Sequence, residues 1–280
     1  MCEGCGHVQQ LREQPQATNA DFQEQYFDGE FAAQADFFTR IYEALNSRRR
    51  LNDLRAVLPT GRVLEVGVGR GGFLVALRRA GYRVEGLDVS AALCAEIGRR
   101  HGLTIHRGTL EAAAEALPGE TFDLLVMCHV LEHVELPIRA LRAARQLLRP
   151  GGMLYVEVPN RLAWSSRLPG WTGYQPYHAH YFSAASLRRG LEAAGFQVRS
   201  EGTVEPLTGW CNAIVGSLYA RRPNVGRLAQ RASTQPKRGL AWIAYNAVRL
   251  GVGAAATPLR WLQGGLGRGE ELVVMAWAED

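Results

Sequence analysis

Hydrophobic and polar positions alternate along the chain in two distinct patterns from residue 61 onward. Short apolar runs, such as 63–66 and 122–127, have the composition of strands that are buried on both faces of a sheet. Between these runs, apolar residues return every three or four positions, as they do on the buried face of a helix. The apolar runs predict strands at 63–66, 82–87, 103–106, 122–127, 153–158, 196–203 and 271–278.

This alternation of strands and helices predicts an α/β fold with a doubly wound, Rossmann-like parallel sheet. Residue types that begin or end helices mark the boundaries between the elements. Ser90 and Ser183 can each cap the N-terminus of a helix, and Pro118-Gly119 can end one. The sequence Pro150-Gly151-Gly152 predicts a sharp turn before the fifth strand.

The segment 206–269, between the last two predicted strands, differs in composition from the rest of the chain. It contains no acidic residue, three tryptophans and nine basic residues, which are Arg221, Arg222, Arg227, Arg231, Lys237, Arg238, Arg249, Arg260 and Arg268. We interpret it as a helical insertion that caps the sheet; the alternative is a helical pair packed on the sheet with a solvated basic face. The predicted organisation is an N-terminal segment at 1–50, a core at 51–205, the cap at 206–269 and a last core strand at 270–280.

Within this cap, residues 240–259 are mostly apolar, but Arg249, Gly251, Gly253 and Pro258 interrupt them. A helix that spans a bilayer needs about 20 predominantly apolar residues, so we do not expect a spanning helix here. Basic residues beside apolar ones favour a peripheral contact with an anionic membrane surface instead.

Composition and cysteine content narrow the class of protein. Apolar residues make up 47% of the 280 residues, which is enough for a full hydrophobic core. The five cysteines are scattered and do not form a disulfide framework, and residues 1–30 lack the apolar stretch of a secretory signal. We therefore expect a cytoplasmic protein. A peripheral contact with the inner face of the membrane, made by the cap at 206–269, is compatible with that location.

The sequence VLEVGVGRGG at 63–72 gives the first indication of chemistry. Gly67, Gly69 and Gly72 satisfy the pattern G-x-G-x-x-G. Gly67, Gly69 and Gly71 also satisfy a second pattern, G-x-G-x-G. At a strand-to-helix turn, such glycines let the backbone approach a ligand closely. Asp88 lies 21 residues after Gly67, where an acidic residue accepts hydrogen bonds from ribose hydroxyls.

Glu65, two residues before Gly67, decides which nucleoside ligand this loop suits. A carboxylate here would repel a pyrophosphate but attract a positively charged ligand. S-adenosylmethionine carries an ammonium and a sulfonium group and no phosphate. The loop therefore favours S-adenosylmethionine over a nicotinamide dinucleotide, which remains the alternative for the loop alone. A Glu65 paired with Arg62 would have no ligand role.

Four motifs in this order make the chain resemble a class I S-adenosylmethionine-dependent methyltransferase over about 61–200. They are VLEVGVGRGGFL (63–74), VEGLDVS (84–90), FDLLVMCHVLEHV (122–134) and LRPGGMLYVEVP (148–159). The LEHV and H-x-H-x-F-S motifs resemble a subfamily related to methyltransferases of sugars and other small molecules. The resemblance implies a seven-stranded sheet with an antiparallel last strand at 271–278.

The resemblance also implies roles for individual residues. Glu65 would help to hold the amino group of the cofactor, Asp88 would bind its ribose hydroxyls, and Val89 would lie against its adenine. A helix within 20–45 would close over the cofactor. The remaining expected cofactor contacts are Gly67, Val68, Gly69, Gly71, Thr109, Leu110, Cys128 and His129.

Four histidines are candidates for catalysis, namely His129, His133, His178 and His180. Methyl transfer from a sulfonium mainly requires that the protein align the acceptor and exclude water. A hydroxyl acceptor also needs a base, and histidine is the usual base near neutral pH. Structural roles are the alternative for His133 and for the stretch HAHYFS, because both motifs recur in relatives of this family.

No metal site is expected from the sequence. His178 and His180 have no nearby carboxylate or third histidine in the sequence to complete a set of ligands. The N-terminal MCEGCGHVQQL resembles half of a zinc ribbon, but Cys2 and Cys5 are only two of the four ligands that tetrahedral zinc needs. The pair could be a vestige, the result of a start site placed too late, or part of a site completed by another chain.

These observations favour a methyltransferase that uses S-adenosylmethionine and acts on a small molecule, by O-methylation of a sugar, lipid-linked or secondary-metabolite acceptor. C-methylation of a nucleotide-linked sugar is the alternative, and the basic cap predicts an acceptor that is anionic or amphipathic. A nucleic-acid partner is not expected, because the chain outside the cap carries a net charge of −4. The alternatives of another class are a nucleic-acid methyltransferase that uses the basic cap and a non-catalytic cofactor-binding partner of another enzyme, and the intact Glu65, Gly67, Gly69 and Asp88 disfavour the second.

Overall fold

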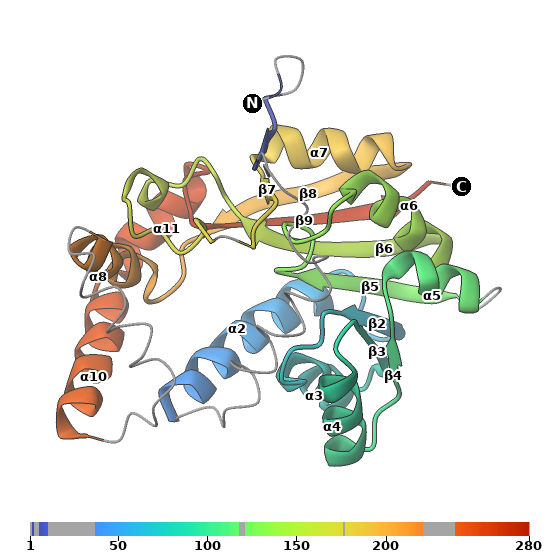
Figure 1. Ribbon diagram of the computed structural model, residues 1–280, viewed down its shortest axis with the longest axis horizontal. Helices are drawn as coiled ribbons and strands as arrows, with labels where there is room; N and C mark the ends of the chain where they lie inside the picture. Colours follow the sequence, from blue (N-terminus) through green and yellow to red (C-terminus); the bar gives the residue numbers. More distant parts are fainter. Residues whose placement is uncertain are drawn as a thin grey trace.

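A seven-stranded sheet with the strand order β4-β3-β2-β5-β6-β9-β8 forms the centre of the molecule (Figure 1). The computed structural model describes Cys2 and residues 6–10, 37–117, 121–175, 177–220 and 239–279. Among the described strands of this sheet, β9 pairs antiparallel with both β6 and β8, and the other pairs are parallel, which confirms the predicted sheet. The strands are β2 (Arg62–Val66), β3 (Arg83–Asp88), β4 (Ile105–Arg107), β5 (Phe122–Cys128), β6 (Leu148–Pro159), β8 (Phe196–Val204) and β9 (Glu271–Ala278).

Helices cover both faces of the sheet. One face packs against α5 (Leu110–Ala116), α6 (Pro137–Leu147) and α7 (Ala184–Ala193), and the other packs against α2 (Phe37–Arg55) and α3 (Gly72–Arg79). α4 (Ala91–His101) adds a smaller apolar cluster beside β3 and β4. Because β2 and β5 are buried on both faces, apolar residues occupy consecutive positions in them rather than alternate ones, as at 63–64 and 124–127.

Both serines that were predicted to cap helices do so. The Ser90 Oγ accepts a hydrogen bond of 3.2 Å from the Leu93 N–H at the start of α4. At α7, the Ser183 Oγ accepts from the Ser186 N–H at 3.3 Å, and the Ser186 Oγ accepts from the Ser183 N–H at 2.9 Å. This reciprocal arrangement satisfies two N–H groups that the helix itself cannot pair.

The turn predicted at Pro150-Gly151-Gly152 proves to be an irregularity inside a longer strand. β6 begins at Leu148, which pairs with Phe122, and the regular pairing resumes between Met153 and Leu124. The residues between the two pairs include Gly151 with a φ of 66°, a conformation that glycine adopts readily. The fifth strand is therefore longer than the predicted 153–158.

The described parts of the segment between β8 and β9 are largely helical and lie beyond the end of the sheet where the two strands meet it (Figure 1). Its helices are α8 (Gly209–Ala220), α10 (Leu240–Ala255) and α11 (Thr257–Gly265). Six of the nine basic residues of this segment, all within 221–238, lie outside the described residues. Of the others, Arg260 is structural, because its guanidinium donates to the Glu205 carbonyl oxygen at 2.8 Å.

The surface of α10 and α11 carries exposed apolar side chains, among them Val248, Leu259 and Trp261. No helix in the described parts of the chain is both long and apolar enough to cross a bilayer. The expected peripheral membrane contact stays a prediction, as do the cytoplasmic location and the domain boundaries.

The N-terminal region differs from its prediction in part. Residues 20–45 were expected to form a helix, and the observed helix α2 overlaps that range only at 37–45; residues 11–36, including Tyr26 and Phe27, lie outside the described residues. A short strand, β1 (Val8–Gln9), pairs antiparallel with β7 (His180–Tyr181), which the sequence analysis did not predict. This pair joins the N-terminal segment to the histidine-containing loop that follows β6.

Close packing at the middle of β3 gives a test of the fold. A Cβ added at Gly86 would lie 2.5 Å from Val68 Cγ1 and 2.8 Å from Ile105 Cδ1, whereas one added at Gly202 in β8 would meet no atom within 4 Å. We expect Gly86→Ala to lower the free energy of unfolding in urea by about 1–3 kcal/mol through overpacking. Gly202→Ala, the matched control, should change it by less than about 0.5 kcal/mol. Equal effects of the two substitutions would contradict the packing described for β3.

Candidate functional site

The glycine loop between β2 and α3 follows a path that only glycine accepts readily. Gly67, Gly69 and Gly71 have φ values of 71°, 50° and 72°, in the left-handed region. A Cβ added at Gly67 would also lie 2.5 Å from Val130 Cγ2, on the turn that follows β5. The first glycine therefore lets the loop pass directly against the end of the neighbouring strand.

A cleft of about 860 Å³ opens over this loop, at the C-terminal ends of the parallel strands. In open α/β sheets, this edge is where ligands bind. Gly71 and two of the candidate histidines, His178 and His180, are not among the residues that line it. The predicted site residues that do line it are Glu65, Gly67, Val68, Gly69, Asp88, Val89, Thr109, Leu110, Cys128, His129 and His133.

Gly71 serves the shape of the loop. Its N–H donates to the Val68 carbonyl oxygen at 2.8 Å, and a Cβ added to it would lie 2.9 Å from Ile97 Cγ2. The second glycine spacing therefore reflects packing of the loop against α4, and Gly72 lines the cleft instead.

Glu65 is a buried carboxyl group at the end of β2, only 5% exposed. Its Oε2 accepts no hydrogen bond from the described residues. Arg62 pairs with Glu85 at 2.6 Å, so the alternative in which Arg62 neutralises Glu65 is wrong. Burial raises the pKa of Glu65 to about 8, although the nearby Arg50 guanidinium opposes the shift. A positively charged ligand group placed beside this carboxyl would favour its ionised form.

Asp88 ends β3 with its carboxylate held by backbone amides. The Asp88 Oδ1 accepts a hydrogen bond of 2.9 Å from the Ser90 N–H. Burial raises the pKa of Asp88, and the backbone N–H groups of Ser90, Val68 and Gly69 oppose that rise. The carboxylate therefore faces the same cleft as the glycine loop, 21 residues after Gly67.

The end of β4 adds an acidic residue that the sequence analysis did not assign. The Thr109 Oγ1 accepts from the Ala112 N–H at 3.3 Å and so caps α5. Glu111, two residues later, lines the cleft together with Thr109 and Leu110. An acidic side chain thus lines the cleft beside Thr109 and Leu110, two of the expected cofactor contacts.

α2 forms a wall of the cleft that the sequence analysis largely missed. Tyr42, Asn46, Arg49 and Arg50 line it from this helix. The helix is also attached to the glycine loop, because Arg70 and Glu43 form an ion pair of 2.9 Å. The polar and charged sequence of α2 gave no apolar pattern by which to assign this role.

A buried carboxylate at the end of β6 fixes α2 in place. Glu157 is 1% exposed, and its oxygens accept hydrogen bonds from Arg49 Nη2 at 2.6 Å and Arg50 Nη2 at 2.8 Å. The Tyr155 hydroxyl donates to the same carboxylate at 3.2 Å. Although burial opposes it, the two guanidinium groups hold the pKa of Glu157 well below its usual range.

His129 follows β5 and is surrounded by carboxylates. Its Nδ1 lies 3.3 Å from Glu132 Oε1, and its Nε2 lies 3.4 Å from Glu271 Oε2 and 3.7 Å from Glu157 Oε1. Despite burial, these negative charges raise the pKa of His129 well above its usual value. An imidazole that already carries a proton is a poor general base, so this geometry separates His129 from the other candidates.

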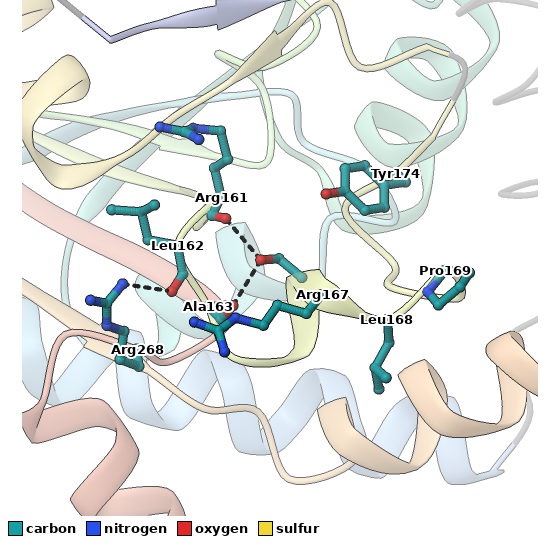
Figure 2. A pocket seen from close by; sticks show the side chains of 9 residues that line it. Arg161, Leu162, Ala163, Arg167, Leu168, Pro169, Tyr174 and Arg268 are labelled. Atoms are coloured by element: carbon teal, nitrogen blue, oxygen red, sulfur yellow. Dashed lines mark hydrogen bonds between the residues drawn. The ribbon is translucent and has the colours of Figure 1, made fainter.

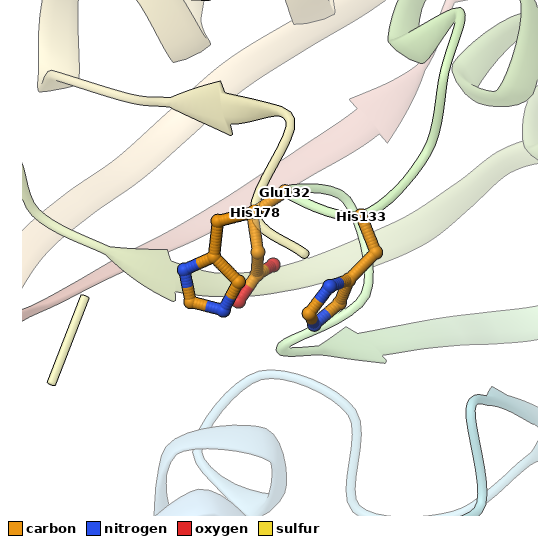
Figure 3. Close-up of side chains that lie close together, drawn as sticks. All are labelled: Glu132, His133 and His178. Carbon is orange, nitrogen blue, oxygen red and sulfur yellow. The ribbon is translucent and has the colours of Figure 1, made fainter. Parts of the chain in front are cut away.

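His133 and His178 lie on either side of Glu132, as Figure 3 shows. One ligand atom from each of the three residues lies within 4.8 Å of the other two. The sequence analysis expected no metal because it found no carboxylate or third histidine beside His178. That premise is wrong, since the fold places Glu132 and His133 there.

His180 is part of the link to the N-terminal segment. One of its ring nitrogens, Nδ1, lies 2.9 Å from His7 Nε2, and the other, Nε2, lies 3.3 Å from the Glu135 carbonyl oxygen. The ring is 4% exposed and belongs to β7. Of the four candidate histidines, His129 and His133 therefore face the cleft directly, and His178 lies behind His133.

A second hollow, of about 450 Å³, lies beside η1 (Ser165–Arg167) and contains none of the predicted site residues (Figure 2). The Arg268 Nη1 donates to the Leu162 carbonyl oxygen at 3.3 Å, and the Ser166 Oγ donates to the Ala163 carbonyl oxygen at 2.7 Å. In the view of Figure 2, the guanidinium groups of Arg161, Arg167 and Arg268 point in different directions. The hollow therefore shows no single point at which these charges converge.

The main cleft has the features that S-adenosylmethionine needs. The Oε2 of buried Glu65 lacks a hydrogen-bond partner among the described residues, beside a loop in which Gly67 leaves no space for a side chain. Asp88, one strand away, lines the same cleft, and a carboxylate at this position can accept hydrogen bonds from ribose hydroxyls. A buried carboxyl next to the loop disfavours a pyrophosphate and favours a ligand with an ammonium group.

Comparisons with known proteins indicate the same cofactor. The family model described as a methyltransferase domain matches residues 33–201, which is more than half of the chain. A protein of Mycolicibacterium smegmatis named "Probable S-adenosylmethionine-dependent methyltransferase" is 36% identical over 138 residues, covering 49% of this chain and 52% of that protein. A ubiquinone biosynthesis O-methyltransferase of Xanthomonas campestris is 32% identical over 163 residues, covering 52% and 66%. The chain thus spans about half to two thirds of the length of these relatives.

The fold is also found in solved structures. The 1,6-didemethyltoxoflavin-N1-methyltransferase of Burkholderia thailandensis, solved with 1,6-didemethyltoxoflavin and S-adenosylhomocysteine, aligns over 100% of this chain and 99% of that one. The TM-score is 0.55 and the sequence identity 17%, so this likeness concerns the fold alone. Taken with the family match over 33–201, it leads to one conclusion: the chain belongs to the methyltransferase-domain family, and its cofactor is S-adenosylmethionine.

Proposed function

We propose that this protein transfers the methyl group of S-adenosylmethionine to an oxygen atom of a small-molecule acceptor. The observation that carries the proposal is the continuity of the cleft, which runs from Glu65 and Asp88 past Cys128 to His129, His133 and Glu271. A cofactor site and a space lined by proton-binding groups are thus parts of one cavity. The naming of several relatives as O-methyltransferases supports oxygen over carbon as the acceptor atom.

Within this proposal, Glu65 binds the ammonium group of the cofactor and Asp88 binds its ribose hydroxyls. The glycine loop lies against the methionine part, and Val89 with Leu110 lies against the adenine. When bound, S-adenosylmethionine supplies a methyl group that its sulfonium already activates. The chain's own residues then have to hold the acceptor in line, exclude water and accept a proton.

The acceptor end of the cleft is polar and contains charges of both signs. Tyr42 and Asn46 lie on the α2 side, and His129, His133 and Glu271 lie on the sheet side. Such a surface suits an acceptor with several hydroxyl groups, because amide, imidazole and carboxylate groups all form hydrogen bonds with hydroxyls. A sugar or a polyhydroxylated metabolite, free or attached to a lipid, fits this lining.

Glu271, at the start of β9, is the group we propose as the proton acceptor. It lines the cleft, and its Oε2 has no hydrogen bond from the described residues. Burial and neighbouring carboxylates raise its pKa to about 7, while His129 opposes the rise. The charged and titratable groups around it are His129, Glu157, Glu270, Glu132 and Tyr42. A base with a pKa near the working pH is effective in general catalysis. His133 is the runner-up.

Ligand-dependent thermal stability tests the choice of cofactor. S-adenosylmethionine and S-adenosylhomocysteine at a hundred times their dissociation constants should stabilise the protein by about 2.7 kcal/mol, a rise in melting temperature of several degrees. NAD at the same concentrations should leave the melting temperature unchanged. Stabilisation by NAD alone would contradict the proposed function.

Methyl transfer itself can be tested with a panel of phenols, catechols and nucleotide-linked sugars and isotopically labelled S-adenosylmethionine. We expect label in an oxygen-linked methyl group of at least one acceptor class, detected by mass spectrometry. The controls are reactions without protein and reactions with Asp88→Ala. Transfer only to carbon would contradict the O-methylation part of the proposal, while stabilisation by the cofactor without transfer to any acceptor would contradict the activity.

Substitution of Glu65 tests the assigned ammonium contact. Because burial keeps part of the Glu65 population protonated at pH 7, binding of an ammonium group should release a proton. Calorimetry in two buffers of different ionisation enthalpy should therefore show proton release in the wild type and none in Glu65→Gln, with S-adenosylmethionine affinity about tenfold lower in the variant. Glu96→Gln on the exposed side of α4 is the matched control. Unchanged affinity in Glu65→Gln would refute the contact.

The pH profile of methyl transfer tests Glu271. A base must be deprotonated to act, so the rate should rise with pH through a midpoint near 7 and level off above it. Glu271→Gln should reduce kcat by about 100-fold or more and remove this rise. S-adenosylmethionine affinity should stay within about twofold of the wild type, because Glu271 is assigned to the acceptor. A variant that keeps the wild-type profile would assign the base elsewhere, with His133→Asn as the next substitution.

A further inference from the structure

A cluster of three metal-binding residue types forms behind the acceptor end of the cleft. Glu132 and His133 lie in the turn between β5 and α6, and His178 lies in the loop before β7. One ligand atom from each lies within 4.8 Å of the other two. Figure 3 shows the Glu132 carboxylate between the two imidazole rings. The proposed methyl transfer assigns no direct task to Glu132 or His178.

The main chain fixes this arrangement. The N–H groups of Ala179 and His180 both donate to the Glu132 carbonyl oxygen, at 2.8 Å and 3.1 Å. The loop that carries His178 is therefore attached to the turn that carries Glu132 and His133. The three side chains come together through backbone hydrogen bonds between segments about 45 residues apart, independent of any bound ion.

Hydrogen bonds to carbonyl groups orient both imidazoles. His178 Nδ1 lies 2.8 Å from the Gly173 carbonyl oxygen, and His133 Nδ1 lies 3.3 Å from the Tyr177 carbonyl oxygen. A carbonyl oxygen can only accept, so each Nδ1 carries the proton, and a neutral ring then has its lone pair on Nε2. Metal-binding histidines are typically held in this way, with the second nitrogen donating to a carbonyl or carboxylate.

Glu132 is the member of the cluster whose environment most needs explanation. It is 1% exposed, and neither carboxylate oxygen accepts a well-formed hydrogen bond from the described residues. The His129 Nδ1 lies 3.3 Å from Glu132 Oε1, which is close enough for charge attraction. Glu132 Oε2 accepts no hydrogen bond from the described residues. A buried carboxylate with so few hydrogen bonds is costly, and a cation bound to it would offset that cost.

We propose that Glu132, His133 and His178 bind a divalent transition-metal ion of the Zn²⁺ type, through one carboxylate oxygen and two Nε2 atoms. Two histidines and one carboxylate form a ligand set that zinc and related ions use when a further position stays open. Nitrogen ligands disfavour Mg²⁺ and Ca²⁺, which prefer oxygen. Because His133 also lines the cleft, the open position would be accessible from the cavity.

The proposed ion would bind whether or not the protein transfers methyl groups to oxygen. The test therefore measures metal binding and not turnover. It also has to separate this cluster from Cys2 and Cys5, the other metal-binding residue types that the sequence analysis identified. Titrations are for this reason done on the wild-type chain and on a Cys2→Ser/Cys5→Ser double variant.

The experiment is a titration of the chelator-treated full chain with Zn²⁺ by calorimetry and with Co²⁺ by visible absorption. We expect a single ion to bind per chain in both backgrounds, with the d–d absorption of a low-coordinate Co²⁺ site. Glu132→Gln and His178→Asn should each weaken binding by at least about tenfold, since even indirect partners of a metal contribute that much. His101→Asn, at the end of α4 and outside the cluster, is the matched control and should bind as the wild type does.

Three outcomes would overturn the proposal. The first is metal binding that is unchanged in Glu132→Gln and His178→Asn, and the second is metal binding that disappears in the double cysteine variant. The third is no binding at micromolar Zn²⁺ or Co²⁺. Stabilisation of each variant by S-adenosylhomocysteine shows that the fold and the cofactor site are intact. Loss of metal binding with that stabilisation retained therefore identifies the cluster itself, and failure of the methyltransferase proposal would appear separately, as absent stabilisation in the wild type.

Discussion

The burial of the Glu157 charge beneath α2 is the interaction on which the cleft depends. The carboxylate extends from the end of β6 and binds Arg49 and Arg50, two consecutive residues of a helix about 107 positions earlier in the chain. Breaking one member of a buried ion pair typically costs about 3–5 kcal/mol. α2 is thus held over the sheet by charge as well as by the apolar contact of Leu54 with the core. Without these ion pairs, α2 would be less firmly held and the cofactor cleft would lose one of its walls.

The carboxyl groups around this cleft differ in how far the protein neutralises them. Glu157 has two guanidinium partners and stays ionised. Glu65 has Arg50 nearby, yet its pKa rises through burial. Glu271 shares His129 with two other carboxylates. The well-paired carboxylate holds the structure together, while the poorly paired ones are the groups whose charge an incoming ligand can change.

Much of the fold could be predicted because local patterns and the sheet agree. The apolar runs of β2 and β5 reflect burial on both faces, and Ser90 and Ser183 mark helix starts that the structure contains. Glu65 could be recognised as well, because a carboxylate before a glycine loop is informative without tertiary contacts. Its role in binding remains a prediction that the proposed substitutions address.

The parts of the site that sequence could not supply all involve residues brought together by tertiary structure. The wall formed by α2 depends on Glu157, which follows it by more than a hundred residues. Glu132 and His178 meet through hydrogen bonds of the Ala179 and His180 amides, for which no sequence pattern exists. Gly71 and His180 lie in sequence patterns that suggest ligand contact. In the structure, however, Gly71 packs against Ile97, and His180 contacts His7. Spacing alone does not distinguish these uses of the same residue types.

The order of strands has a consequence for how the chain is made. Among the described strands, β8 pairs with β9 alone, and β9 separates it from β6. During synthesis, the edges of β6 and β8 stay unpaired until the chain between β8 and β9 has been translated, which takes on the order of several seconds at ordinary elongation rates. Unpaired edges readily join strands of other chains. The length of chain between β8 and β9 thus sets how long each nascent chain remains exposed to aggregation.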